Sequence, residues 1–236
     1  MKAISRAGKI IFASLIFFIA IFIGNENVFA ATTDVSTFTQ LEAALTSAQK
    51  GDIINVKDNI KLTETLVIDG KDITISGSST ISADSALENV DTRKNTLFYI
   101  KGSNVTFKGL TLDGAKMNRI IYSEGIKISE TETKYSNITL ESAKIINGCP
   151  GDNSNINPGG GIFLRGGSLT ATDTDFIGNT PGTNDTLQQG DGDKNGGAIY
   201  SGSTKADITI TGGKFENNEV KAYGHGAGIY QENGSL

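Results

Sequence analysis

The residues whose types and spacing most resemble a reactive or metal-binding set lie in NDTLQQGDGDKNGG, residues 184–197. Asp191, Asp193 and Asn195 alternate along it and are followed by Gly196. This pattern matches the start of a calcium-binding loop, D-x-D-x-N-G. Position twelve of that loop is Gly202 instead of glutamate, so the match is incomplete. Asp191, Asp193 and Asn195 are therefore the candidate ligands of Ca²⁺, with a solvated acidic loop as the alternative, and no other cofactor is expected.

The second candidate for chemistry is His225, the one histidine of the chain, which stands between Gly224 and Gly226. A Gly-His-Gly segment resembles one motif of the polygalacturonases. The companion motifs of that family, Asn-Thr-Asp, Asp-Asp and Arg-Ile-Lys, do not occur in the sequence. His225 therefore has two possible interpretations, as a catalytic residue or as a structural one.

A repeat of about thirty residues must position these side chains. Five segments align on an apolar anchor, and their spacings are 32, 33, 31 and 39 residues. The anchors are Ile73, Val105, Ile138, Leu169 and Ile208. A short polar residue precedes each anchor, and a threonine follows it: Asp72, Asn104, Asn137, Ser168 and Asp207 before, and Thr74, Thr106, Thr139, Thr170 and Thr209 after. The alternation predicts one strand per copy, with the anchor buried and the threonine on the opposite face.

A second pattern recurs in the later half of the chain, as GGGIF (159–163), GGAIY (196–200) and GAGIY (226–230). The glycines predict tight corners, and Ile162, Ile199 and Ile229 are expected to fill the interior. Aligning HGAGIY with NGGAIY places His225 over Asn195, and over Asn157 in NPGGGIF. We therefore interpret His225 as a polar residue at a turn.

The alignment also tests for catalytic groups. A glycoside hydrolase needs two facing carboxylates, and a pectate-lyase-like enzyme needs acidic Ca²⁺ ligands and a basic proton acceptor. Two outward columns can be read: Thr111, Lys144, Asp175 and Lys214, and Ser76, Lys108, Glu141, Thr172 and Thr211. Neither brings two carboxylates together. Arg165 is the remaining candidate base, with a solvated turn cation as the simpler interpretation, so the sequence predicts no catalytic residue.

Such a unit cannot bury its apolar face alone, but stacked units can. We therefore predict an all-β fold, a right-handed parallel β-helix of the pectin-lyase-like type, over residues 53–236. Residues 31–52 should hold a capping helix. Thr37 and Gln40 form a capping box, a stripe of Phe38, Leu41, Ala44, Leu45 and Ala48 faces the core, and Gly51 ends the helix. The segments 52–56 and 65–68 are expected as the first strands.

The residues after position 35 resemble the pectate-lyase-like adhesive domains of secreted and surface proteins. The matching segments are FTQLEAAL, GDIINVKDNIKLTETLVIDGKDITISG and NVTFKGLTLDGA. The motifs GGAIY and FENN are similar to the repeats of polymorphic outer-membrane proteins. This resemblance implies the β-helix fold and a role in adhesion, although superhelical β-folds carry both enzymes and binding proteins.

The first thirty residues predict a secretory signal peptide. Lys2, Arg6 and Lys9 precede the apolar run 10–24, and Val28 and Ala30 fit a cleavage site after Ala30. An uncleaved anchor helix is the alternative. Without residues 1–30 the chain has 18 Lys and Arg against 25 Asp and Glu, a net charge of −7. This charge disfavours nucleic acid as a partner, and no later segment is apolar enough to cross a membrane.

These observations together predict a secreted or cell-surface bacterial protein that acts in adhesion or binding. The expected partner is a polysaccharide or a component of a host surface or matrix. A polysaccharide lyase or glycoside hydrolase acting on acidic polysaccharide is the alternative. Aromatic platforms often bind sugars, and the candidates are Tyr122, Tyr135, Tyr200, Tyr223 and Tyr230. GSL (234–236) overlays GSL (167–169), so Leu236 should begin a sixth copy, and we expect the chain to be a fragment.

Overall fold

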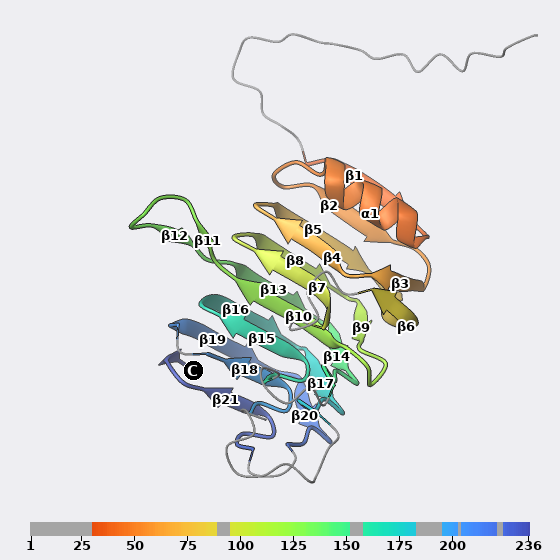
Figure 1. Ribbon diagram of the computed structural model, residues 1–236. Coiled ribbons are helices and arrows are strands. Elements are labelled where there is room, and N and C mark those ends of the chain that lie inside the picture. The colour runs from red at the N-terminus through yellow and green to blue at the C-terminus, as the bar shows by residue number, and fades with distance from the viewer. Residues whose placement is uncertain (1–29, 89–94, 152–157, 183–194, 203, 221–223) are drawn as a thin grey trace, which may run out of the picture.

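The protein is built almost entirely of parallel β-sheet, as Figure 1 shows. The computed structural model describes residues 30–88, 95–151, 158–182, 195–202, 204–220 and 224–236. Within these residues there is one helix, α1 (Phe38–Ser47), three large sheets of eight, six and six strands, and one two-stranded sheet. The all-β prediction is therefore confirmed.

The three sheets are named A, B and C. Sheet A contains, in spatial order, β1 (Thr32–Val35), β2 (Ile53–Val56), β5 (Asp72–Gly77), β8 (Asn104–Lys108), β13 (Asn137–Glu141), β16 (Gly167–Thr172), β19 (Ala206–Thr211) and β22 (Gly234–Ser235). Sheet B contains β3 (Ile60–Glu64), β6 (Thr80–Glu88), β9 (Thr111–Asp113), β14 (Lys144–Ile146), β17 (Asp175–Ile177) and β20 (Lys214–Glu216). Sheet C contains β4 (Leu66–Asp69), β7 (Thr96–Lys101), β10 (Arg119–Glu124), β15 (Ile162–Arg165), β18 (Ile199–Ser201) and β21 (Ile229–Gln231).

From β2 onward the chain visits sheets A, B and C in the same order in every repeat. Each strand pairs in parallel with its equivalents in the preceding and following repeats. The predicted anchors are partners in this register: Ile73, Val105, Ile138, Leu169 and Ile208. The repeat alignment is thus confirmed, and the arrangement is compatible with a parallel β-helix.

The core lies between the three sheets. Ile75 of sheet A, Leu112 of sheet B and Ile121 of sheet C are all fully buried members of one apolar cluster. Ile162 and Ile199, expected to fill the interior, are also fully buried, whereas Ile229 is partly buried. Because successive side chains of a strand point to opposite faces, the inward side chains of the three strands in each repeat form one layer of the core.

Two-residue corners join sheet A to sheet B. Their first residue has a left-handed backbone, with φ of +72° at Gly109, +49° at Ser142, +47° at Asp173 and +71° at Gly212. Glycine enters this region without steric cost, and short polar residues enter it more readily than others. The abundance of Gly, Ser and Asp between the strands follows from these corners.

Helix α1 lies at one end of the sheets, beside β1 and β2 (Figure 1). The predicted capping box is formed in part: Gln40 N donates to Thr37 Oγ1 (3.3 Å), but Gln40 Oε1 accepts from Ser36 N (2.8 Å), one residue before the N-cap, and not from Thr37 N. The predicted apolar stripe is confirmed. Four of its residues are buried and Phe38 packs partly buried against them: Leu41, Ala44, Leu45 and Ala48.

The end of the helix differs from the prediction. Helix α1 ends at Ser47, and Ala48 is already extended with ψ of 135°. Lys71 Nζ donates to the carbonyls of Thr46 and Ala48, and so satisfies the last turn before Gly51 is reached. Gly51, with φ of +90°, serves the following turn.

Two elements were not expected from the sequence. Strand β1 precedes the helix and pairs with β2, so sheet A begins before α1. A hairpin of β11 (Ile126–Lys127) and β12 (Thr133–Lys134) is the antiparallel element of the described chain and projects from the sheets (Figure 1). Both are too short to show a period of their own.

Among the described residues, no helix has the length and hydropathy needed to span a membrane. The predicted signal peptide lies outside the described residues, except for Ala30.

Candidate functional site

A shallow groove of about 280 Å³ opens on the outer face of sheet A. It crosses β5, β8 and β13, and the loop after α1 borders it through Gly51. The lining combines the polar column, the anchors and the threonine column: Asp72, Ile73, Thr74, Asn104, Val105, Thr106, Asn137 and Thr139. The groove therefore lies on the columns that define the repeat.

The polar column is a continuous chain of hydrogen bonds. Asn104 Nδ2 donates to Asp72 Oδ1 (2.8 Å), Asn137 Nδ2 donates to Asn104 Oδ1 (2.7 Å), and Ser168 Oγ donates to Asn137 Oδ1 (2.7 Å). Every donor points toward Asp72, which ends the ladder as a pure acceptor. Parallel strands in register place equivalent side chains about 4.8 Å apart, so adjacent amides can reach one another.

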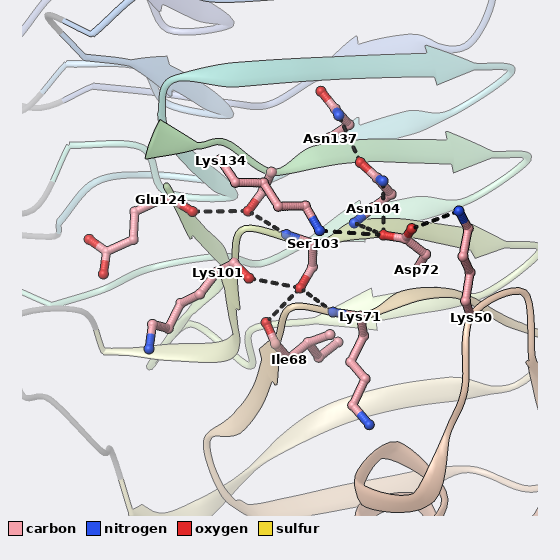
Figure 2. A network of polar contacts seen from close by, with 11 residues as sticks. Lys50, Ile68, Lys71, Asp72, Lys101, Ser103, Asn104, Glu124, Lys134 and Asn137 are labelled. Atoms are coloured by element: carbon pink, nitrogen blue, oxygen red, sulfur yellow. Dashed lines mark hydrogen bonds and ion pairs between the residues drawn. The ribbon is translucent and has the colours of Figure 1, made fainter. Parts of the chain in front are cut away.

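Buried serines at the corner from sheet C to sheet A hold this ladder in place (Figure 2). Ser103 Oγ accepts from Lys71 N (3.0 Å) and bonds the carbonyls of Lys101 (2.8 Å) and Ile68 (3.1 Å). Ser136 Oγ accepts from Ser103 N (3.3 Å) and bonds the Glu124 carbonyl (3.0 Å). Both serines are fully buried, and each stands immediately before a ladder residue.

Two lysines from outside the sheets approach Asp72 (Figure 2). Lys50 Nζ, from the loop after α1, lies 3.9 Å from Asp72 Oδ2. Lys134 Nζ, from the hairpin strand β12, lies 4.0 Å from Asp72 Oδ1. The Lys50 side chain is 86% exposed and that of Lys134 is 40% exposed, so these long ion pairs contribute little stability. The position of the two lysines is the relevant feature, because it places two ammonium groups at the rim of the groove.

The groove is suited to binding a ligand rich in hydroxyl groups. The threonine hydroxyls donate and accept, the Asp72 carboxylate accepts, and each asparagine amide nitrogen has a second N–H beyond the one used along the ladder. Asp72 is the one carboxylate among the described residues that line the groove. A facing pair of carboxylates, which glycoside hydrolysis requires, is therefore not formed by that lining.

The two outward columns read from the sequence are columns in the structure. Thr111, Lys144, Asp175 and Lys214 are partners in sheet B. Ser76, Lys108, Glu141, Thr172 and Thr211 are partners in sheet A. Lys108 Nζ lies 3.0 Å from Glu141 Oε2, so this carboxylate is paired with its neighbour in the column.

His225 lies in the turn before β21 of sheet C, whereas the groove lies on sheet A. Its N–H donates to Asn195 Oδ1 (2.8 Å), its carbonyl accepts from Gly196 N (2.9 Å), and its ring packs on Tyr230 with centroids 6.1 Å apart. The predicted place over Asn195 is confirmed. In the preceding repeat the equivalent residue is Pro158, not Asn157. Asn195 lies four residues before Ile199, and Pro158 lies four residues before Ile162, the register partner of Ile199. Asn157 itself lies outside the described residues.

Arg165 is not placed to accept a proton. Its Nη1 donates to the Tyr122 hydroxyl (3.3 Å) and lies 3.8 Å from Glu124 Oε2. The hydrogen bond to Tyr122 raises the pKa of Arg165 above its ordinary value, with the Glu124 charge adding to the effect. Arg165 therefore stays protonated and acts as a cation on sheet C.

An aromatic ladder on sheet C was largely missed by the sequence analysis. The rings of Tyr99, Tyr122, Phe163, Tyr200 and Tyr230 are register partners, with neighbouring centroids 4.8 to 5.8 Å apart. The signal was an aromatic residue directly after each interior apolar residue, as in FY, IY and IF. Tyr122 and Tyr200 are 5% exposed, so neither is a platform for a sugar.

Arg119 is a fully buried charged residue that packs against this ladder. Its guanidinium lies 5.5 Å from the Tyr122 ring and 5.3 Å from the Phe163 ring, and Nε and Nη2 donate to the carbonyls of Gly159 and Pro158 at 2.9 Å. Burial lowers the pKa of Arg119 to about 9, which leaves it protonated at neutral pH. We assign it a structural role, as a cation stacked on aromatic rings.

The predicted calcium ligands fall mostly outside the described residues. Asp191 and Asp193 are not described, whereas Asn195 is buried and its Oδ1 accepts from His225. Within the described ranges, no three His, Cys, Asp or Glu residues form a group that could hold a metal ion. The calcium site stays a prediction.

Comparison with known proteins gives no match: no family model, no curated protein and no solved structure matches the chain.

Proposed function

We propose that the protein is a secreted or cell-surface binding protein with a right-handed parallel β-helix of the pectin-lyase-like type, and that it acts in adhesion to a polysaccharide of a host surface or matrix. The observation that carries this proposal is the hydrogen-bonded ladder from Asp72 to Asn137, which lines one groove beside a threonine column. A hydroxyl-rich ligand matches such a surface, because each of its groups can both donate and accept.

The repeat and the predicted signal peptide support the remaining parts of the proposal. The three parallel sheets, visited in constant order, are compatible with the β-helix that the pectate-lyase-like resemblance implies. The cationic start, apolar run and small residues of positions 1–30 support export in a bacterium. Lys50 and Lys134 at the groove rim are compatible with a carboxylated or neutral glycan.

The proposal is tested by removing hydroxyl groups without changing shape. In Thr106→Val/Thr139→Val the groove loses two hydroxyls, while the strands keep β-branched residues. Two hydrogen bonds of about 0.7 kcal/mol each correspond to about a tenfold weaker affinity. Binding is measured by calorimetry against the oligosaccharide that a glycan array selects for the wild-type protein.

The matched control is Thr209→Val, in the same column two strands beyond the groove. We expect wild-type affinity for this variant. Equal losses in both variants, or no glycan bound by the wild type, would contradict the proposal. New reducing ends or unsaturated products during incubation with pectate or alginate would replace it with an enzyme.

Calcium binding by Asp191, Asp193 and Asn195 is a separate proposal, supported by the D-x-D-x-N-G sequence. A ligand of the native state must raise its melting temperature. We expect a higher melting temperature in millimolar Ca²⁺ than in EDTA, and no such difference in Asp193→Asn. An identical melting temperature for the wild type in both solutions would exclude the site.

A further inference from the structure

Counted back from sheet A, Tyr135 stands at a position that is glycine in three other repeats and Lys205 in the repeat of Asp207. Asn104, Asn137 and Ser168 are partners in sheet A, and Asp72 is the partner of Asn104. Two places before Asp72, Asn104, Asn137 and Ser168 stand Gly70, Gly102, Tyr135 and Gly166, respectively. All three glycines have a left-handed backbone, with φ of +66°, +49° and +86°. The hairpin β11–β12 is inserted between Gly125, which follows sheet C as Gly102 and Gly166 do, and Tyr135, which precedes sheet A.

The Tyr135 ring lies against glycines that leave room for it. A Cβ added to Gly166 would come within 2.6 Å of ring atoms Cδ1 and Cε1, and one added to Gly125 within 2.7 and 2.9 Å. The Cδ1–Cε1 edge of the ring therefore lies next to the backbone of Gly125 and Gly166. The residue is nevertheless 39% exposed. A ring held this way is ordered before any ligand arrives, which lowers the entropic cost of binding.

Tyr135 differs from the other described aromatic residues that could meet a ligand. Tyr122 and Tyr200 are buried in the sheet C ladder, and Tyr99 and Tyr230 pack partly buried against them. Phe215 is exposed to the same extent, 39%, but stacks on Phe176 at a centroid distance of 4.7 Å. Tyr135 thus belongs neither to the sheet C ladder nor to the stacked pair of Phe176 and Phe215.

Tyr135 is also a close neighbour in sequence of residues at the groove. Lys134, the preceding residue, lies 4.0 Å from Asp72, and Asn137, two residues on, lines the groove. Two residues of extended chain span about 7 Å, which is comparable to the length of one sugar ring. A glycan on the polar ladder can therefore extend over Tyr135.

We propose that Tyr135 forms an aromatic subsite at the edge of the sheet A groove, where it stacks against the C–H face of a pyranose ring. The ligand class is a glycan with a hexopyranose unit whose C–H groups gather on one face, while its hydroxyls bond Asn137 and the neighbouring threonines. This inference rests on the proposed glycan binding. It adds a contact outside the groove, between Tyr135 and one pyranose ring of the ligand.

The test compares three substitutions in the oligosaccharide-binding assay. Tyr135→Ala should bind about tenfold more weakly, a loss of about 1.4 kcal/mol, because the substitution removes the ring on which the sugar stacks. Tyr135→Phe should bind like the wild type, because stacking needs the ring rather than the hydroxyl. Ile128→Ala is the matched control, an exposed apolar residue (53%) of the same hairpin, and should leave affinity unchanged.

Nuclear magnetic resonance of the ligand gives a readout that a purely structural role would not move. Stacking shifts the C–H proton signals of the pyranose upfield through the ring current. We expect this shift with the wild type and with Tyr135→Phe, and none with Tyr135→Ala. This spectrum also tests the wild type alone, should the alanine variant fail to fold.

The outcomes separate this inference from the proposal on which it rests. Glycan binding that weakens in Thr106→Val/Thr139→Val, but is unchanged in Tyr135→Ala and shows no ring-current shift, overturns the aromatic subsite alone. Binding that weakens equally in Tyr135→Ala and Ile128→Ala assigns the effect to the hairpin and also overturns the subsite. A wild type that binds no glycan overturns both ideas.

Discussion

At the scale of single residues, buried serine hydroxyls divide into two kinds. Ser103 and Ser136 bond the backbone at the corner before the polar ladder. Ser123 and Ser201, equally buried on the inner face of sheet C, have no hydrogen-bond partner for Oγ within the described chain. A bonded hydroxyl stabilises the fold, whereas one without a partner is desolvated at a cost.

This contrast predicts opposite effects for one substitution. Ser103→Ala removes the acceptor of Lys71 N and should lower the free energy of unfolding by about 1–3 kcal/mol. Ser123→Ala removes a hydroxyl that forms no bond within the described chain and should leave that free energy unchanged or raise it slightly. Urea denaturation at constant m-value measures both. A loss at Ser123 as large as that at Ser103 would refute the explanation.

At the scale of elements, Asp52 joins the end of α1 to the start of β1. Its carboxylate accepts from Gln49 N (2.8 Å) and Ala31 N (2.9 Å), immediately before β2 begins. The hydrogen bond from Gln49 is the main cause, and that from Ala31 the second, of a pKa below the ordinary value of 3.8. The Asp52 carboxylate thus connects the residue before β1 with the turn after α1.

The lowered pKa predicts a pH-dependent effect for Asp52→Asn. A carboxyl with a lowered folded pKa stabilises the fold above its unfolded pKa, and this stabilisation is lost as the pH falls through the folded value. The variant should therefore unfold more easily than the wild type at pH 7, and the difference should shrink progressively below pH 3.8. Unfolding free energies from urea titrations at several pH values measure this difference.

The control for this experiment is Asp58→Asn, an exposed aspartate in the loop between β2 and β3. It should show a smaller difference from the wild type at neutral pH. A constant difference for Asp52→Asn from pH 7 to pH 2 would show that the carboxylate bonds are not its cause.

At the scale of the whole molecule, the two ends of the stacked sheets are unlike. Helix α1 covers the core at the β1–β2 end, where Leu41 is fully buried. At the other end, Phe215 of β20 is 39% exposed and Leu236, after β22, is 77% exposed. In stacked repeats each unit is stabilised by its neighbours, so a unit with one neighbour opens more easily.

Amide hydrogen exchange should follow this gradient. Strands β20, β21 and β22 should exchange faster than β8, β9 and β10, which have a neighbour on both sides. Peptide-level mass spectrometry resolves the two groups of strands. Equal protection in both would mean that the sheets unfold as one unit.

The sequence by itself determined the repeat, because the anchors from Ile73 to Ile208 recur at one register and parallel pairing requires that register. It also determined the capping helix, since a capping box and an apolar stripe are local signals. Only the tertiary structure decided which columns meet. The groove, the lysines at Asp72 and the edge contact of Tyr135 join residues from different repeats and from a hairpin without periodicity. Their proximity arises from how the strands stack, which no local pattern specifies.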